Sequence, residues 1–157
     1  MVSEPEQRGL TLPDAVARTM LHHARAELPN EACGLVSGSI GTGLAIAYHP
    51  ARNSEHSPLR YTVDTDDLLR ITLEIEAAGR DLVGIFHSHT HTPAVPSPTD
   101  LREAMYPEPF YILAAMADPA APPDRAMRAW RIRGGESMEV TLRVDGGDRT
   151  ERAKEVP

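Results

Sequence analysis

The chain has 157 residues, of which 41% are hydrophobic and 25% are charged, and its formal net charge is −7. This length fits a single domain with a sizeable buried core, and the acidic balance argues against a protein that binds nucleic acid. The single cysteine, Cys33, excludes an internal disulfide, the N-terminus lacks the basic and apolar regions of a signal peptide, and no apolar run is long enough to span a membrane. These features predict a cytoplasmic protein with no membrane association.

The first element that the apolar spacing predicts is a helix. Residues 1–9 are polar and are expected to be loose. In residues 13–28 the apolar side chains recur at helical spacing, and Pro13 suits the first turn of a helix.

From residue 32 onward, short apolar runs alternate with turn residues and with one longer helical pattern. The elements expected there, in chain order, are strands 32–39, 43–49 and 59–63, a helix that Asp64 or Thr65 caps and Gly79 ends, strand 82–89, helix 98–105, strand 110–117, a proline-rich turn over 118–125, and strands 126–132 and 137–144. The charged tail 145–157 has no apolar period and is expected to be disordered. The mixture of hairpins and helices predicts one α/β domain over residues 10–144, built around a mixed sheet.

The stretch from His87 to Asp100 carries the strongest functional signal. Side chains of a strand alternate between its two faces, so His87 and His89 point the same way, as two ligands of one metal must. Ser97, Pro98 and Asp100 suit the N-cap, the first and the third position of a helix, and the first turn of that helix can face back over the strand end. Asp100 would then be the third ligand of a catalytic zinc, which takes three protein ligands and keeps one position for water.

Each of these residues also has an ordinary structural explanation. A His-x-His pair alone is a weak motif, and either histidine can be a polar residue at a strand exit. Serine is a preferred N-cap residue, and the helix dipole favours an acidic residue such as Asp100 in the first turn. The spacing of the whole set is what indicates a metal site.

The same residues resemble those of a known family. His-x-His, seven residues, Ser, two residues and Asp is the pattern of the JAMM metalloproteases, also called the MPN+ family, and it is filled by His87, His89, Ser97 and Asp100. The resemblance covers residues 12 to 133. It implies the JAMM/MPN fold, which is cytidine-deaminase-like, with a curved mixed β-sheet flanked by helices. It also implies one Zn²⁺ per chain, held by the two histidines and Asp100.

The family has a further glutamate that opens a strand upstream, and Pro29-Asn-Glu31-Ala-Cys33 resembles that element. The bare sequence would place Glu31 in a solvated loop. By the resemblance, Glu31 is the general base that takes a proton from the attacking water and passes it to the leaving amine. Ser97 would donate a hydrogen bond to the oxyanion.

Within the family, the chain most resembles the small stand-alone bacterial enzymes of the Mec type. The shared segments are Glu31-Ala-Cys-Gly, residues 53–58, and His-Ser-His-Thr, in which Thr90 stands where many members have proline. The resemblance implies an isopeptidase or amidase that cuts after the C-terminal Gly-Gly of a small ubiquitin-like or sulfur-carrier protein. The expected reaction releases cysteine from a carrier–cysteine adduct, as in cysteine biosynthesis. A homodimer, and a part for residues 54–58 in the substrate groove, stay open.

Three other functions are weighed against this one. The first is a desampylase-like or deubiquitinase-like enzyme that removes small protein modifiers with the same chemistry. The second is a histidine-triad nucleotide hydrolase, which the extension of the series to His91 suggests, although that family has apolar residues between its histidines. The third is a non-catalytic MPN scaffold, which would lack the ligands. His91 itself is expected to be a solvent-facing loop residue, and Cys33 a small buried hydrophobic residue rather than a nucleophile.

Overall fold

The computed structural model describes residues 9–146. The segment expected to be loose, 1–9, lies outside this range except for Gly9. The tail expected to be disordered, 145–157, lies outside it except for its first two residues. None of the helices in the described range is long and apolar enough to cross a membrane.

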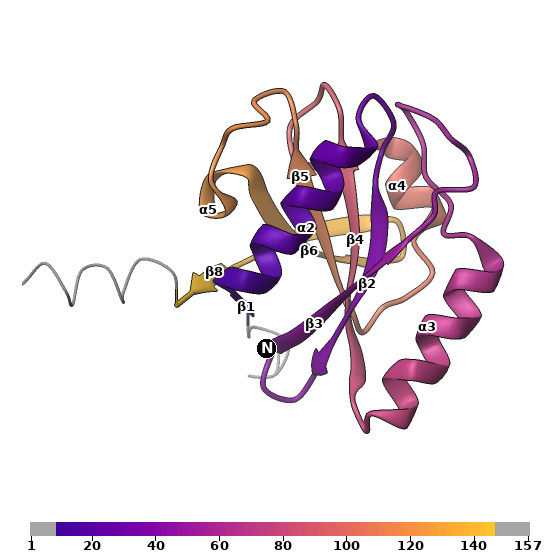
Figure 1. Ribbon diagram of the computed structural model, residues 1–157, viewed down its shortest axis with the longest axis vertical. Helices are drawn as coiled ribbons and strands as arrows, with labels where there is room; N and C mark the ends of the chain where they lie inside the picture. Colours follow the sequence, from indigo (N-terminus) through magenta and orange to yellow (C-terminus); the bar gives the residue numbers. More distant parts are fainter. Residues whose placement is uncertain (1–8, 147–157) are drawn as a thin grey trace, which may run out of the picture.

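Within residues 9–146, eight strands form one mixed sheet in the order β7-β6-β5-β4-β2-β3-β1-β8 (Figure 1). The strands are β1 (Leu10–Pro13), β2 (Cys33–Ser39), β3 (Leu44–Ala51), β4 (Asp81–His89), β5 (Phe110–Ala115), β6 (Met127–Arg133), β7 (Glu136–Val140) and β8 (Leu142–Asp145). β4 lies near the centre, antiparallel to β2 and parallel to β5. The expected α/β class with a mixed sheet is therefore confirmed.

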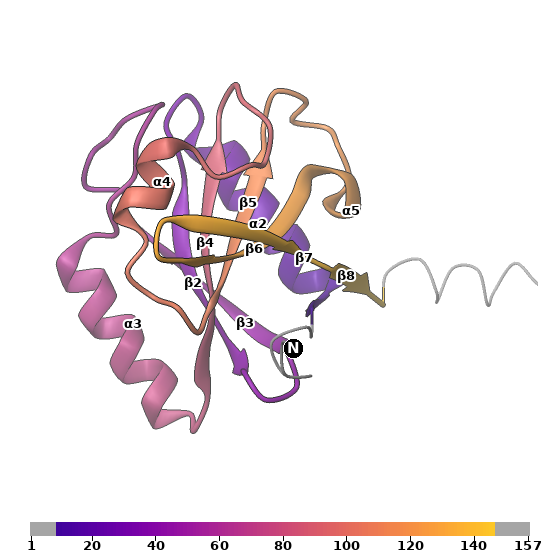
Figure 2. The ribbon, with the colours of Figure 1, turned by 180° about the vertical axis from the view of Figure 1, so that it is seen from behind.

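The sheet is strongly curved because one continuous segment belongs to both of its edges. β7 pairs with β6 at one edge, and one residue later β8 pairs with β1 at the other. At the joint, the carbonyl of Thr141 accepts a hydrogen bond of 2.9 Å from the Leu10 amide. Figure 2 shows this segment crossing in front of β4 and β5, so that the sheet nearly closes into a barrel.

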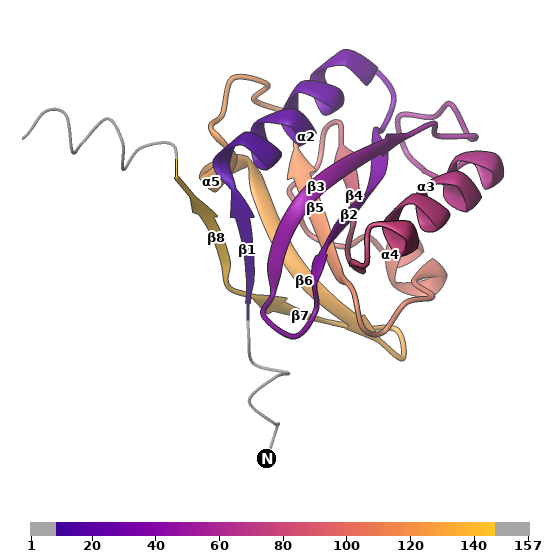
Figure 3. The same cartoon turned by 60° about the horizontal axis from the view of Figure 1, so that its bottom comes forward.

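Helices cover both faces of the sheet (Figure 3). α2 (Asp14–Glu27) buries a helical stripe of apolar residues against a core that includes Phe86 and Ile112. On the other face, α3 (Thr65–Ala77) packs Ile71 and Ile75 into a second core, and the short helix α4 (Pro98–Glu103) covers the end of β4. The fourth helix in the described range is α5 (Pro123–Ala126).

One expected strand is wrong. Residues 59–63 lie in a loop between β3 and α3, and only an isolated bridge joins Asn53 to Val63. The backbone groups of this segment have other partners, because the carbonyl of Arg60 and the amide of Thr62 hydrogen-bond the Asn53 side chain.

The ends of the sheet also differ from expectation. Strand β1 was not predicted, and the expected strand 137–144 is two strands that break at Thr141. Asp145, expected to begin the tail, pairs with Pro13 at the end of β8. The expected turn 118–125 runs into the helix α5, which begins at Pro123. The strands β1 and β8 depend on pairing between distant segments, which local patterns do not contain.

Candidate metal centre

His87 and His89 lie at the end of β4 and share one face of the strand, as alternation predicts. The same face carries Ile85, which belongs to the core under α3, whereas Phe86 belongs to the opposite core. Both imidazoles are almost fully buried, His87 at 1% and His89 at 4% exposure. Hydrogen-bonded neighbours on both sides of β4 therefore hold the two rings on a rigid support.

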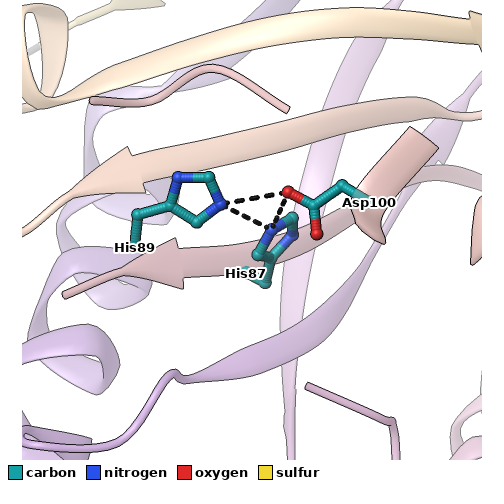
Figure 4. Close-up of side chains that lie close together, drawn as sticks. All are labelled: His87, His89 and Asp100. Atoms are coloured by element: carbon teal, nitrogen blue, oxygen red, sulfur yellow. Dashed lines mark hydrogen bonds and ion pairs between the residues drawn. The ribbon is translucent and has the colours of Figure 1, made fainter. Parts of the chain in front are cut away.

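Asp100 reaches the histidines from the first turn of α4. Ser97 is the N-cap of this helix, and its hydroxyl accepts the Asp100 amide at 3.1 Å. In return, Asp100 Oδ2 accepts the Ser97 amide at 2.8 Å, which completes a capping box. The same Oδ2 faces both imidazoles (Figure 4). Asp100 therefore completes the helix cap and faces the two histidines at the same time.

The three facing atoms form a nearly equilateral triangle. The distances are 3.2 Å between the two Nε2 atoms, 3.2 Å from His87 Nε2 to Asp100 Oδ2, and 3.1 Å from His89 Nε2 to the same oxygen. In a tetrahedral zinc site with bonds of about 2.0–2.1 Å, two ligand atoms lie about 3.3 Å apart. His89 Nδ1 donates to the carbonyl of Pro93 at 2.8 Å, so Nε2 is the ring nitrogen that would bind a metal. The set His87, His89 and Asp100 is therefore a group that could hold a metal ion, with the donor types that zinc takes.

The local electrostatics favour a charged carboxylate at Asp100 and shift the pKa values of the two imidazoles in opposite directions. Burial opposes ionisation of Asp100, but hydrogen bonds from the two histidines outweigh it and hold the pKa of this carboxyl well below its usual range. Burial lowers the pKa of His87, which favours its neutral form. For His89, burial acts in the same direction, but the contacts with Asp100 and Pro93 raise its pKa overall. A cation bound here would replace the protons that otherwise lie between Asp100 and the imidazoles.

Glu31 is a buried residue and not the solvated loop residue that the bare sequence suggests. It is 5% exposed and lies two residues before Cys33, the first residue of β2, which pairs with His87. Burial raises the pKa of Glu31 to about 7, and no group in the described residues hydrogen-bonds its carboxylate. A carboxyl group with a pKa near neutrality suits a group that accepts and returns a proton. The neighbouring Ala32 exchanges two hydrogen bonds with Ser88 of β4, which brings the main chain at Glu31 beside the strand that carries the two histidines.

The loop between β3 and α3 contributes a residue that sequence analysis missed. The ring of Tyr61 stacks on His87, with centroids 4.2 Å apart and planes inclined by 18°. Within residues 9–146, His87 Nδ1 has no hydrogen-bond partner, so this stacking takes the place of the usual polar contact that orients a ligand histidine. Thr90 anchors the same loop, because its hydroxyl donates to the carbonyl of Pro58 at 2.9 Å. Tyr61 lies beyond the shared segment 53–58, and no signal in the sequence singles it out.

The remaining candidate residues are not among the three facing ligand residues. His91 is exposed in the loop after β4, as expected. Cys33 is fully buried, and burial raises the pKa of its thiol to about 12, which leaves no thiolate to act as a nucleophile. Ser97 is half-buried, and its hydroxyl proton stays available as a donor because the oxygen acts as an acceptor in the cap.

A family model described as "Prokaryotic homologs of the JAB domain" matches residues 13–133. This match covers most of the chain, and the chain belongs to this family, the JAB/MPN or JAMM group. Its members of known fold include a solved structure described as "JAMM: A Metalloprotease-like Zinc Site in the Proteasome and Signalosome", which has a TM-score of 0.54 at 19% identity and covers 88% of this chain and all of that one. At that identity the likeness establishes the fold, which is the JAMM/MPN fold.

Comparison with individual relatives narrows the kind of enzyme further. The chain is 35% identical over 129 residues to the CysO-cysteine peptidase of Mycobacterium tuberculosis, covering 82% of this chain and 86% of that one. It is 32% identical over 141 residues to the desampylase of Haloferax volcanii, covering 87% and 96%. A solution structure of a protein from Desulfitobacterium hafniense has a TM-score of 0.75 at 31% identity, covering 87% and 94%. The chain is accordingly a hydrolase of the JAMM family, and the alternative of a histidine-triad nucleotide hydrolase is set aside.

Proposed function

We propose that the protein is a zinc-dependent peptidase that cuts after the C-terminal Gly-Gly of a small ubiquitin-like or sulfur-carrier protein. The triangle formed by His87, His89 and Asp100, with a buried Glu31 beside it, carries this proposal. A non-catalytic scaffold would have no use for a buried carboxyl group whose pKa is about 7 next to three converging ligand atoms.

The residues divide the chemistry between them. Zinc, when bound by His87, His89 and Asp100, supplies a Lewis acid that polarises the scissile carbonyl and lowers the pKa of a water to about 7. Glu31 takes a proton from the attacking water and delivers it to the departing nitrogen. Ser97 donates its hydroxyl proton to the oxygen that gains negative charge. Burial raises the pKa of Glu31 to about 7, so near neutral pH this carboxyl can accept a proton and give it up again, as the two steps require.

An apolar cavity beside the centre offers room for the substrate. It has a volume of about 470 Å³ and is bounded on one side by Asp100. Its other walls come mainly from the loop before α3, from α3, from the sheet and from the segment after α4, including Tyr61, Leu68, Ile85 and Tyr106. A Gly-Gly end has no side chains, so it can pass the crowded ligands while an apolar residue of the substrate fills this cavity.

The activities named for the relatives support two different leaving groups in the proposed reaction. The CysO-cysteine peptidase supports release of cysteine from a carrier–cysteine adduct, which we favour. The desampylase and the "Probable TtuB-protein conjugate cleaving protease" of Thermus thermophilus support removal of a small modifier from a protein. Both reactions use the same residues and differ only in the group that is joined to the Gly-Gly end.

Mass spectrometry separates these possibilities. The zinc-loaded protein is incubated with a sulfur-carrier protein that bears cysteine on its Gly-Gly end and, separately, with a lysine-linked ubiquitin dimer. We expect cysteine release and an intact dimer, and no release by a Glu31→Gln control. Rapid cleavage of the dimer with an untouched adduct would assign the protein to the modifier-removing enzymes. Failure on both substrates would refute the proposed function.

A further inference from the structure

Asn53 is a buried polar residue outside the set that carries the proposed chemistry. It lies just after β3 in the chain and is 6% exposed. Its Nδ2 donates to the carbonyls of Glu31 at 3.1 Å and Arg60 at 3.0 Å. Its Oδ1 accepts the amides of Glu55 at 3.1 Å and Thr62 at 3.0 Å. A primary amide offers two donated and two accepted hydrogen bonds, and all four are made here with main-chain groups.

These four bonds join two parts of the site that are distant in sequence. One partner is the main chain of Glu31, whose amide also donates to the carbonyl of Ser57 at 2.9 Å. The other partners belong to the loop that carries Tyr61, the residue stacked on His87. A single side chain therefore links the segment that carries the proposed base to the loop that packs on the first proposed ligand.

The segment of Glu31 is fixed from its other side by β4. The Ala32 amide donates to the hydroxyl of Ser88 at 2.8 Å, and the Ala32 carbonyl accepts the Ser88 amide at 3.0 Å. Ser88 lies between the two histidines and points to the opposite face of the strand. Residues 31 and 32 are thus hydrogen-bonded to Asn53 on one side and to the strand of the candidate ligands on the other.

We propose that Asn53 is a positioning residue that fixes the Glu31 carboxylate relative to His87 and His89, acting through the main chain of Glu31 and the loop of Tyr61. This inference rests on the proposed function for its kinetic consequence. The hydrogen bonds themselves do not depend on it. Because the carboxylate of Glu31 has no hydrogen bond of its own among the described residues, its position is set by its main chain.

Asn53→Asp tests the inference with the smallest change of shape. Aspartate keeps both accepting positions but loses at least one of the two N–H donors, so the carbonyls of Glu31 and Arg60 are no longer both satisfied. Asn30→Asp is the matched control, because it places the same new charge next to Glu31. The Asn30 side chain makes no hydrogen bond in the described part of the chain.

With the carrier–cysteine adduct as substrate, we expect kcat of Asn53→Asp to fall on the order of 10²-fold, the usual consequence of a misplacement of about 1 Å. KM should change far less, and the zinc content should stay at that of the wild type, because no ligand is altered. Asn30→Asp should keep the wild-type kcat. An unchanged kcat in Asn53→Asp, or a loss of zinc from it, would overturn the inference.

A double-mutant cycle distinguishes positioning of Glu31 from a general loss of structure. In a Glu31→Gln background, Asn53→Asp should cost little further rate under single-turnover conditions, since the base is already absent. Equal losses in both backgrounds would mean that Asn53 acts independently of Glu31.

A measurement on the unaltered protein covers the case in which the variant does not fold or the substrate is wrong. In the wild type, both Nδ2 protons of Asn53 should exchange slowly with solvent by NMR, whatever the substrate is. Exchange at the rate of a free side-chain amide would show that the hydrogen bonds of Asn53 are not formed. This result would overturn the inference and would leave the proposed function untouched.

Discussion

Glu31 and Asp100 are both largely buried carboxyl groups, yet their surroundings set their pKa values in opposite directions. Burial raises the pKa of Glu31 to about 7 because no hydrogen bond compensates for it. The pKa of Asp100 is held low because two histidines and the Ser97 amide contact its Oδ2. Two carboxyls with separated pKa values indicate separated roles, one that exchanges a proton and one that stays charged.

Replacing Glu31 by glutamine should separate chemistry from metal binding. Glutamine keeps the size of the side chain but cannot accept a proton, so we expect kcat on the carrier–cysteine adduct to fall by about 10²–10⁴-fold. Zinc content should be unaffected, because Glu31 is not one of the three facing ligands. Steady-state kinetics and metal analysis on the same preparation check both statements. Turnover near that of the wild type would remove Glu31 from the mechanism.

At the scale of single residues, most of the candidate site can be predicted from the sequence, because local structural rules place its residues. Strand alternation places His87 and His89 together, and helix-start chemistry places Asp100 in a first turn, so local rules suffice for these three. Glu31 became a candidate only through the family resemblance, because its burial depends on distant partners such as Ser57. Asn53 was only noted within a shared segment and Tyr61 was not identified, because their roles arise from contacts across the fold.

At the scale of secondary structure, the elements with strong periodicity were predicted well. The helix expected from Asp64 is α3, and Asp64 caps it by accepting the Asp67 amide at 3.1 Å. The errors fall on short segments at the edges, such as β1 and residues 59–63, where pairing partners or side-chain hydrogen bonds outweigh local preference.

Asp67 joins α3 to the end of β3 and should give the protein a recognisable pH dependence. Its carboxylate accepts the Arg52 amide at 2.8 Å and the Arg52 Nε at 3.1 Å. The Arg52 side-chain and main-chain hydrogen bonds lower the pKa of Asp67 from its ordinary value of 3.8 to about 2. A pKa that is lower in the folded state stabilises the fold above the unfolded value and stops doing so as the pH falls through the folded value.

Asp67→Asn should therefore unfold at a lower denaturant concentration than the wild type at pH 7, and the difference should shrink between about pH 4 and pH 2. Denaturant titrations at pH 7, 4 and 3 check this, and the comparison with the wild type at each pH removes any common loss of metal. Asp66→Asn, an exposed neighbour, should differ much less from the wild type. A difference that is the same at every pH would contradict the assignment.

The whole molecule places two of the three candidate ligands, His87 and His89, on a central strand of a nearly closed sheet. β4 is bonded on both sides, and the two cores on its faces hold it between α2 and α3. The class of fold could be predicted from the mixture of hairpins and helices, but the closure could not. Closure requires β7 to pair with β6 and β8 to pair with β1 at the opposite side of the sheet. The local pattern of residues 137–144 predicts one strand and does not indicate this change of partner.

The zinc content of the purified protein tests the metal centre most directly. We expect about one zinc per chain in the wild type and a sharp fall in each of His87→Ala, His89→Ala and Asp100→Ala, because a structural or catalytic zinc needs its full set of protein ligands. His91→Ala is the matched control and should keep its zinc, since His91 is an exposed histidine only two residues beyond the ligands. Absence of zinc from the native protein, or unchanged zinc in all three ligand variants, would contradict the metal centre described for this chain.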